Sequence, residues 1–142
     1  MTRLRMFCAI AAVMTLSLSM HHITEAAQTS TLERALGAWH SSEQFEGEPR
    51  VQFAFRQQGT EVVGWVVMLG QQRKGNDHTV LALSFCDVRA DGDRVRFTSM
   101  LPDDEGTIGW EMRPTADGKG VLSAITENGT PLPEPIVWDV QR

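Results

Sequence analysis

The stretch VQFAFRQQGTEVVGWVVML, residues 51–69, decides the fold class of this chain. Its first part alternates between apolar and other side chains, so that Val51, Phe53 and Phe55 share one face, as in a strand with one buried face. A polar turn around Gly59 follows, and the rest of the stretch is almost continuously apolar. A strand that is apolar on both faces is normally covered on both. The stretch therefore predicts a β-hairpin whose second strand also meets a loop or a partner on its outer side.

The same strand-length alternation recurs along the rest of the chain, separated by turn residues at intervals typical of all-β barrels and sandwiches. The eight predicted strands are residues 37–42, 51–56, 61–69, 79–88, 94–100, 107–113, 121–126 and 136–141. A single helical turn at residues 31–35 is expected before the first strand, and a loop at residues 70–77.

The connections between these strands are too short for the crossovers that parallel strands need, so we expect antiparallel neighbours. A meander of this kind either leaves two exposed edges or closes on itself, and closure removes the edges. The predicted fold is therefore all-β: an eight-stranded antiparallel up-and-down β-barrel with a short N-terminal helical turn. Its first and last strands lie side by side. Its interior is just wide enough for side chains or for one small ligand.

The N-terminal segment has the three parts of a secretory signal peptide. Two arginines give a positively charged start, residues 6–20 form an apolar run, and small residues before Ala27 form a cleavage site. The apolar run is too short for a comfortable membrane span, and no later segment is long enough. We therefore expect a signal peptide at residues 1–27, one barrel domain at residues 28–142, and export to a periplasm or to the extracellular space.

The net charge of the chain limits the classes of partner that we expect. The formal net charge is −5, and removal of the expected signal peptide, with Arg3, Arg5 and Glu25, makes it −6. Nucleic acids and anionic membranes both bind preferentially to proteins with a basic surface, so we expect neither as a partner.

Cys86 is the only cysteine left after cleavage, which rules out an internal disulfide. A lone cysteine in an apolar strand is expected to be a small core residue.

The segment LGAW, residues 36–39, follows the helical turn and carries a Gly-x-Trp on the first strand. It resembles the opening of the calycin group, which includes lipocalins, fatty-acid-binding proteins and avidins. The rest of the chain resembles a family of bacterial secreted lipocalin-like modules, through VQFAFRQQGTEVVGW, ALSFCDVRADGDRVRF and GWEMRPTADGKGVLSAITENGTPLPEPIVWDVQR. The resemblance covers nearly all of residues 36–142. It implies an antiparallel barrel closed at one end by a tryptophan, with a cavity for a small apolar molecule, and no settled activity.

Trp39 is expected to be the plug of the barrel, because it lies just after the helical turn and therefore at one end. There it would cover the core and leave its indole N–H in need of a partner. Arg142 and Arg113 are the candidates for a cation that packs over its ring. The other three tryptophans, Trp65, Trp110 and Trp138, also lie on predicted strands, where core packing competes with a role as a ligand platform.

The candidate ligand-binding residues are large apolar side chains on the predicted strands: Phe53, Phe55, Trp65, Leu83, Phe97 and Trp110. The bulky strand faces carry no ionisable group, so acid–base catalysis inside the barrel is not favoured and no catalytic residue is predicted. His40 and His78 lack the spacing of metal ligands, so neither a metal nor a cofactor is expected.

Two functions from different classes remain open. The first is an exported, non-catalytic, lipocalin-like protein that binds a small, largely apolar ligand at or inside one open end of the barrel. The alternative is a structural or protein-interaction module with a filled barrel, whose third strand, residues 61–69, docks on a partner protein or on a second copy. An enzyme ranks third.

Overall fold

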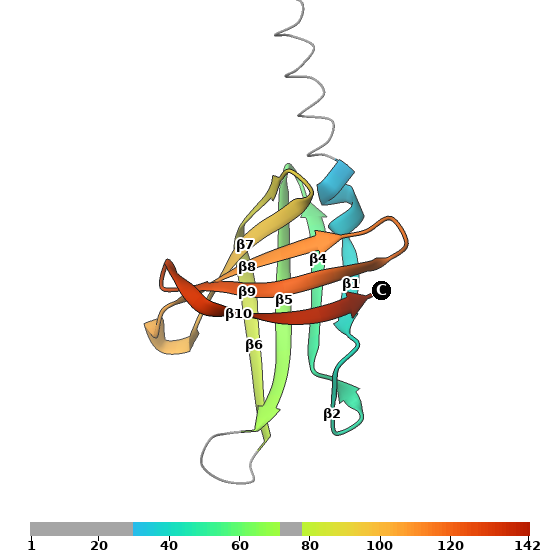
Figure 1. Ribbon diagram of the computed structural model, residues 1–142. Helices are drawn as coiled ribbons and strands as arrows, with labels where there is room; N and C mark the ends of the chain where they lie inside the picture. The colour runs from blue at the N-terminus through green and yellow to red at the C-terminus, as the bar shows by residue number, and fades with distance from the viewer. Residues whose placement is uncertain (1–29, 72–77) are drawn as a thin grey trace, which may run out of the picture.

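The computed structural model describes residues 30–71 and 78–142, and it shows one closed β-barrel with a short helix, residues 30–35, at one end (Figure 1). The predicted signal peptide and most of the predicted loop at residues 70–77 lie outside the described residues. The barrel strands are β1 (Gly37–Ser41), β4 (Val51–Gln58), β5 (Glu61–Gln71), β6 (His78–Asp91), β7 (Arg94–Met100), β8 (Thr107–Pro114), β9 (Lys119–Glu127) and β10 (Thr130–Gln141).

The barrel closes through its first strand, which pairs with two neighbours at once. On one side of β1, Trp39 lies opposite Phe53 of β4, and on the other side His40 lies opposite Gln141 of β10. Every strand pair in the barrel is antiparallel, and the order around it is β1-β10-β9-β8-β7-β6-β5-β4. The predicted fold class is confirmed, including the contact between the first and last strands.

Six of the eight strands extend beyond their predicted boundaries, because the connections are shorter than expected, whereas β1 ends one residue early and β7 has the predicted bounds. The last strand begins at Thr130 rather than at Ile136, directly after a turn in which Asn128 and Gly129 have φ values of 51° and 76°. Two positive φ values in a two-residue connection are typical of the type I′ hairpin turn. A register shift between Pro131 and Ile136 then bends the strand.

The segment of chain that connects β1 to β4 forms a small two-stranded sheet, β2 (Gln44–Phe45) and β3 (Glu48–Pro49), which was not predicted. Figure 1 shows it at the opposite end of the barrel from the N-terminal helix. A 3₁₀ helix, η1 (Pro102–Asp104), connects β7 to β8.

The interior of the barrel is a column of aromatic rings. Phe97 lies at the centre of this column, with its ring centroid 5.0 Å from that of Phe55 and 4.2 Å from that of Phe85. Trp39 stacks on Phe53 at one side and Trp110 stacks on Phe97 at the other, each with centroids 6.3 Å apart. The fully buried core also contains apolar side chains around these rings: Val51, Val66, Val95, Met112, Leu122 and Val140.

Trp39 closes one end of the barrel, as predicted. Its side chain is 2% exposed, and its indole N–H donates to the carbonyl oxygen of Ala35 at 2.8 Å. The guanidinium of Arg142 lies 4.9 Å from the ring centroid and donates to the carbonyl oxygen of Arg34 at 2.6 Å. Of the two predicted cations, Arg142 is therefore the one above the ring, because Arg113 instead pairs with Asp93 at 3.3 Å.

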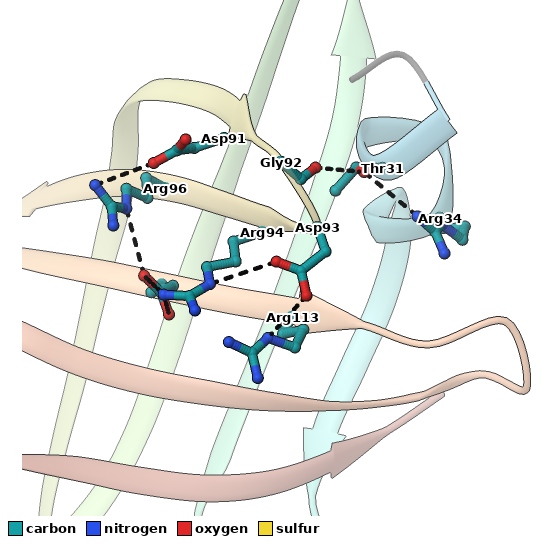
Figure 2. Close-up of polar contacts among 9 residues, drawn as sticks. Thr31, Arg34, Asp91, Gly92, Asp93, Arg94, Arg96 and Arg113 are labelled. Atoms are coloured by element: carbon teal, nitrogen blue, oxygen red, sulfur yellow. Dashed lines mark hydrogen bonds and ion pairs between the residues drawn. The ribbon is translucent and has the colours of Figure 1, made fainter. Parts of the chain in front are cut away.

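The N-terminal helix is tied to the barrel by a side-chain hydrogen bond. Thr31, which is 1% exposed, donates its hydroxyl to the carbonyl oxygen of Gly92 in the turn between β6 and β7 at 2.9 Å (Figure 2). The hydroxyl of Thr31 also accepts from Arg34 at 3.3 Å. The helix therefore forms a lid over Trp39 that is anchored to the far side of the barrel.

An ion-pair network on the outer face joins β6, β7 and β8 beside this lid (Figure 2). Arg94 donates to both carboxylate oxygens of Glu111, at 3.1 and 3.2 Å, and Arg96 donates to the same carboxylate at 3.3 Å. The hydrogen bond to Glu111, and then its charge, raise the pKa of Arg94 above its ordinary value. Asp91 and Asp93 balance the network from the adjacent turn.

Two predictions about side-chain direction need correction. Cys86 is exposed on the outer face of β6 and is not a core residue, because the inward positions of that strand belong to Leu83 and Phe85. Trp65 also points outward, with 46% of its surface exposed, because β5 pairs with β4 so that Trp65 lies opposite Ala54. Gly64 takes the inward position instead.

Glycine is required at position 64, where β5 passes close to its neighbours. A Cβ atom at this position would lie 2.2 Å from the carbonyl oxygen of Ala54 and 2.7 Å from the ring of Phe85. Glycine therefore lets β5 pass close to both neighbours, which is a common use of glycine inside a strand.

We predict that Trp39→Ala lowers the free energy of unfolding by about 3–5 kcal/mol, the usual range for removal of a large buried aromatic side chain. Trp65→Ala is the matched control, and because Trp65 is partly exposed we expect a loss of at most about 1 kcal/mol. Urea unfolding followed by circular dichroism measures both. Equal losses would contradict the assignment of Trp39 as the plug.

Candidate functional site: an apolar cavity at the open end of the barrel

A cavity of about 360 Å³ opens at the end of the barrel opposite the helix. The strand segments that line it are the start of β4, the end of β5, the starts of β6 and β8, the second half of β9 and the middle of β10. Its wall consists of Arg50, Val51, Met68, Leu69, Gly70, Leu81, Ile108, Trp110, Ala124, Ile136 and Trp138. Apolar side chains dominate this set, as is typical of sites for small apolar molecules.

Trp110 forms a rigid part of the wall. It is 1% exposed, its ring stacks on Phe97, and its indole N–H donates to the hydroxyl of Ser99 at 2.8 Å. Ser99 is itself fully buried, so this hydrogen bond satisfies both polar groups inside the core. Because its N–H is already used and its side chain is 1% exposed, Trp110 forms a packed base of the cavity and offers no free donor.

The space in the cavity comes from small side chains opposite large ones. Ala124 of β9 lies opposite both Trp110 of β8 and Ile136 of β10 in the strand registers. At Gly70 of β5, an added Cβ would meet nothing within 4 Å. Larger residues at either position would fill part of the cavity.

At the mouth of the cavity, apolar side chains are in contact with solvent. Ile136 is 54% exposed although it lines the cavity, and Trp138, whose ring centroid lies 6.1 Å from that of Trp110, is half-buried. Removal of such surface from water by a ligand is favourable by roughly 25 cal/mol for each Å² of apolar area. The arrangement can therefore bind an apolar molecule without a prior change of the barrel.

Arg50 lies at the rim and is positioned by the β2–β3 sheet. Its guanidinium lies 5.4 Å from the ring centroid of Phe45, and its Nε lies 3.7 Å from a carboxylate oxygen of Glu43. Its backbone N–H donates to Glu43, and its carbonyl oxygen accepts from Leu69, both at 2.9 Å. Among the described residues of the wall, Arg50 alone carries a charge.

The six predicted ligand-binding residues do not surround one cavity. Trp110 lines the cavity. Phe53, Phe55, Leu83 and Phe97 are buried deeper in the core, where they pack against one another and their neighbours. Trp65 lies on the outside of the barrel, where it lines a separate hollow of about 510 Å³ on the outer face of β4, β5 and β6. Ligand contact by the other five therefore stays a prediction.

Most residues of the wall were missed by the sequence analysis, although the sequence contained a usable signal. Trp39 marks one end of the barrel as closed, so the opposite ends of the strands must form the open end. The inward positions at those ends include Met68, Leu81, Ile108 and Trp138. Combining the plug with the strand directions would have identified them.

Residues 30–71 and 78–142, the part of the chain that the structure describes, contain no group of three or more His, Cys, Asp or Glu side chains that could hold a metal ion. They also contain no helix that is both long and apolar enough to span a bilayer.

Comparison of the chain with protein-family models, with curated proteins and with solved structures finds no match. The closed eight-stranded antiparallel barrel agrees with the calycin-like architecture that the resemblance implied. The fold and the cavity therefore carry the functional argument.

We predict that Ser99→Ala lowers the free energy of unfolding by about 1–3 kcal/mol, because it leaves the buried N–H of Trp110 without a partner. Ser84→Ala is the control, since Ser84 is exposed on the outer face of β6, and its effect should stay within about 0.5 kcal/mol. Chemical unfolding of both variants decides this. A loss at Ser99 no larger than that at Ser84 would show that the hydrogen bond does not fix Trp110.

Proposed function

We propose that this protein is an exported, non-catalytic binding protein that takes up a small, largely apolar molecule in the cavity at the open end of its barrel. The single observation that carries the proposal is the contrast between the two ends. One end is sealed by Trp39 and the helix, whereas the other holds a cavity of about 360 Å³ with an apolar wall.

The physical basis of binding is burial of apolar surface against a wall that is already formed. Trp110 is fixed by its stacking and its hydrogen bond, so the base of the cavity is formed before a ligand binds. Preformed sites of this kind lose less affinity to conformational ordering than sites that must assemble.

Two further parts of the proposal rest on the sequence. Export follows from the predicted signal peptide at residues 1–27, and places the protein in a periplasm or outside the cell. Membership of the bacterial secreted lipocalin-like modules follows from the resemblance along residues 36–142, and the closed barrel supports it at the level of architecture.

The test uses 1-N-phenylnaphthylamine, a neutral apolar dye whose fluorescence rises when it leaves water. We predict saturable binding by the protein and loss of most of that binding in Ala124→Phe, whose ring would occupy the cavity. Ala82→Phe is the matched control, because it makes the same substitution at an exposed alanine on the outer face of β6. Fluorescence titration of the three proteins gives the result.

Unchanged dye binding by Ala124→Phe would contradict the proposal, and so would an absence of binding by the unmodified protein. Circular dichroism of each variant shows that the barrel is folded, so a loss of binding reports on the cavity.

As a second candidate we propose self-association through the outer face of β5. This is favoured by an apolar strip on that face, where Trp65 is 46% exposed and Val80 of the adjacent strand is 63% exposed, with Val63 and Val67 half-buried on either side of Trp65. Exposed apolar patches of this kind mark interaction surfaces in soluble proteins.

For this second candidate, sedimentation velocity over a range of concentrations should show a dimer that Trp65→Ser weakens. Val137→Ser is the control, since Val137 is 55% exposed on β10, away from β5. A monomer at every concentration, or equal weakening by both variants, would exclude the outer face of β5 as a dimer interface.

A further inference from the structure

We propose that β10 has a free edge, residues 135–139 on the side that faces away from β9, which binds an extended cationic peptide as an added strand. The inference goes beyond the small-molecule function, because its binding groups are the backbone of β10 and not the wall of the cavity. The partner is a polypeptide with several Lys or Arg residues in an extended stretch.

The free edge exists because β1 is much shorter than β10. The strand β10 has β9 along one side, but on its other side β1 reaches only its last residues, through the pairs His40–Gln141 and Ser41–Val140. After Ser41 the chain turns away into the β2–β3 sheet (Figure 1). In the part of the chain that the structure describes, no strand therefore pairs with this side of β10 before its last residues.

The last contact between the two segments shows which backbone groups face the free edge. The N–H of Ser42 donates to the carbonyl oxygen of Asp139 at 2.9 Å, so the backbone groups of Asp139 point away from β9. Alternate residues of an antiparallel strand point their backbone groups to the same side, so those of Val137 also face the edge. Among the described residues, the N–H groups of Val137 and Asp139 have no acceptor. An added strand can supply these acceptors.

Prolines limit the free edge to a short stretch beside the cavity. Pro131, Pro133 and Pro135 lack an N–H, and proline on an edge strand protects it from unwanted pairing. The residues that follow, Ile136 and Trp138, line the cavity. Alternate side chains of an added strand would therefore lie over the mouth of the cavity. Strand addition of this kind combines main-chain hydrogen bonds with pockets for alternate side chains.

The two segments that border the free edge are acidic, which selects the charge of the partner. Five carboxylates and one guanidinium lie on residues 42–50 and 130–141: Glu43, Glu46, Glu48, Glu134, Asp139 and Arg50. The single guanidinium, that of Arg50, is already paired with Glu43 at 3.7 Å. A peptide with basic residues is attracted by this field, and an acidic peptide is repelled.

The probe is the peptide acetyl-KTVKVTK-amide, which has alternate valines and three positive charges, in a heteronuclear NMR titration of the full barrel domain. We predict saturable binding with the largest amide shifts at Val137 and Asp139. The acidic counterpart acetyl-ETVEVTE-amide should bind at least about tenfold more weakly, the factor expected from several exposed charge pairs. Raised salt should weaken binding of the cationic peptide.

Two further measurements test the backbone pairing itself. Methylation of the backbone nitrogens of the three central residues of the peptide blocks both of its edges and should abolish binding. Val137→Pro should weaken binding by about tenfold, because it removes an N–H that faces the free edge and no hydrogen bond to β9. Val137→Thr is the matched control, since it changes the same side chain and keeps the N–H, and it should stay within about twofold.

Binding that needs the basic residues, the unmethylated peptide backbone and the N–H of Val137 supports the inference. It is overturned if the peptide does not bind, if both charge forms bind equally, if the methylated peptide or Val137→Pro binds normally, or if the shifts centre on other strands. Self-association that Val137→Pro removes, without peptide binding, would assign the edge to a second copy of the chain and also overturn it.

The dye titration with 1-N-phenylnaphthylamine separates this inference from the proposed function. Dye binding without peptide binding leaves the small-molecule function standing and overturns the inference. Peptide binding without dye binding does the reverse.

Discussion

The whole structure depends on the pairing of the short strand β1 with both β4 and β10. Without these two sets of hydrogen bonds the sheet would have two open edges, and the aromatic side chains inside it would meet water. The strand that closes the barrel also carries Trp39, so the same five residues, Gly37–Ser41, close the sheet and seal one end. The strand that closes the sheet therefore also seals the end of the barrel next to the helix. The cavity lies at the opposite end.

The interior divides into a packed core and a cavity at one end, and the division has a physical cause. Around Phe97, large rings from opposite strands interlock at centroid distances of 4.2 to 6.3 Å and leave no room for a ligand. Toward the open end, Ala124 and Gly70 replace such rings, while Trp110 and Trp138 remain as walls. The aromatic column therefore serves as a rigid base for the cavity, and the rim beyond it is the place where polar groups can meet both a ligand and water.

Much of the fold could be predicted from the sequence, because strand alternation and glycine turns are local signals. Residues 94–100 form a strand with the predicted bounds, and Asn128-Gly129 forms a turn with the two positive φ values that this dipeptide favours. The direction of Trp65 was missed because alternation alone does not say which face is inside. The two-residue turn between Gln58 and Glu61 fixes that register, and it places Trp65 opposite Ala54 rather than beside the inward Phe55. The cavity was missed for a different reason: its wall comes from residues of several strands that are far apart in sequence.

The four tryptophans lie in four different environments, so they report directly on the central claim that the open end is the binding site. Trp39 seals the closed end, Trp110 and Trp138 line the cavity, and Trp65 lies outside. In a heteronuclear NMR titration with 1-N-phenylnaphthylamine, the account predicts shifts of the indole N–H signals of Trp110 and Trp138, with those of Trp39 and Trp65 unchanged. Shifts confined to Trp65 or to Trp39 would contradict it.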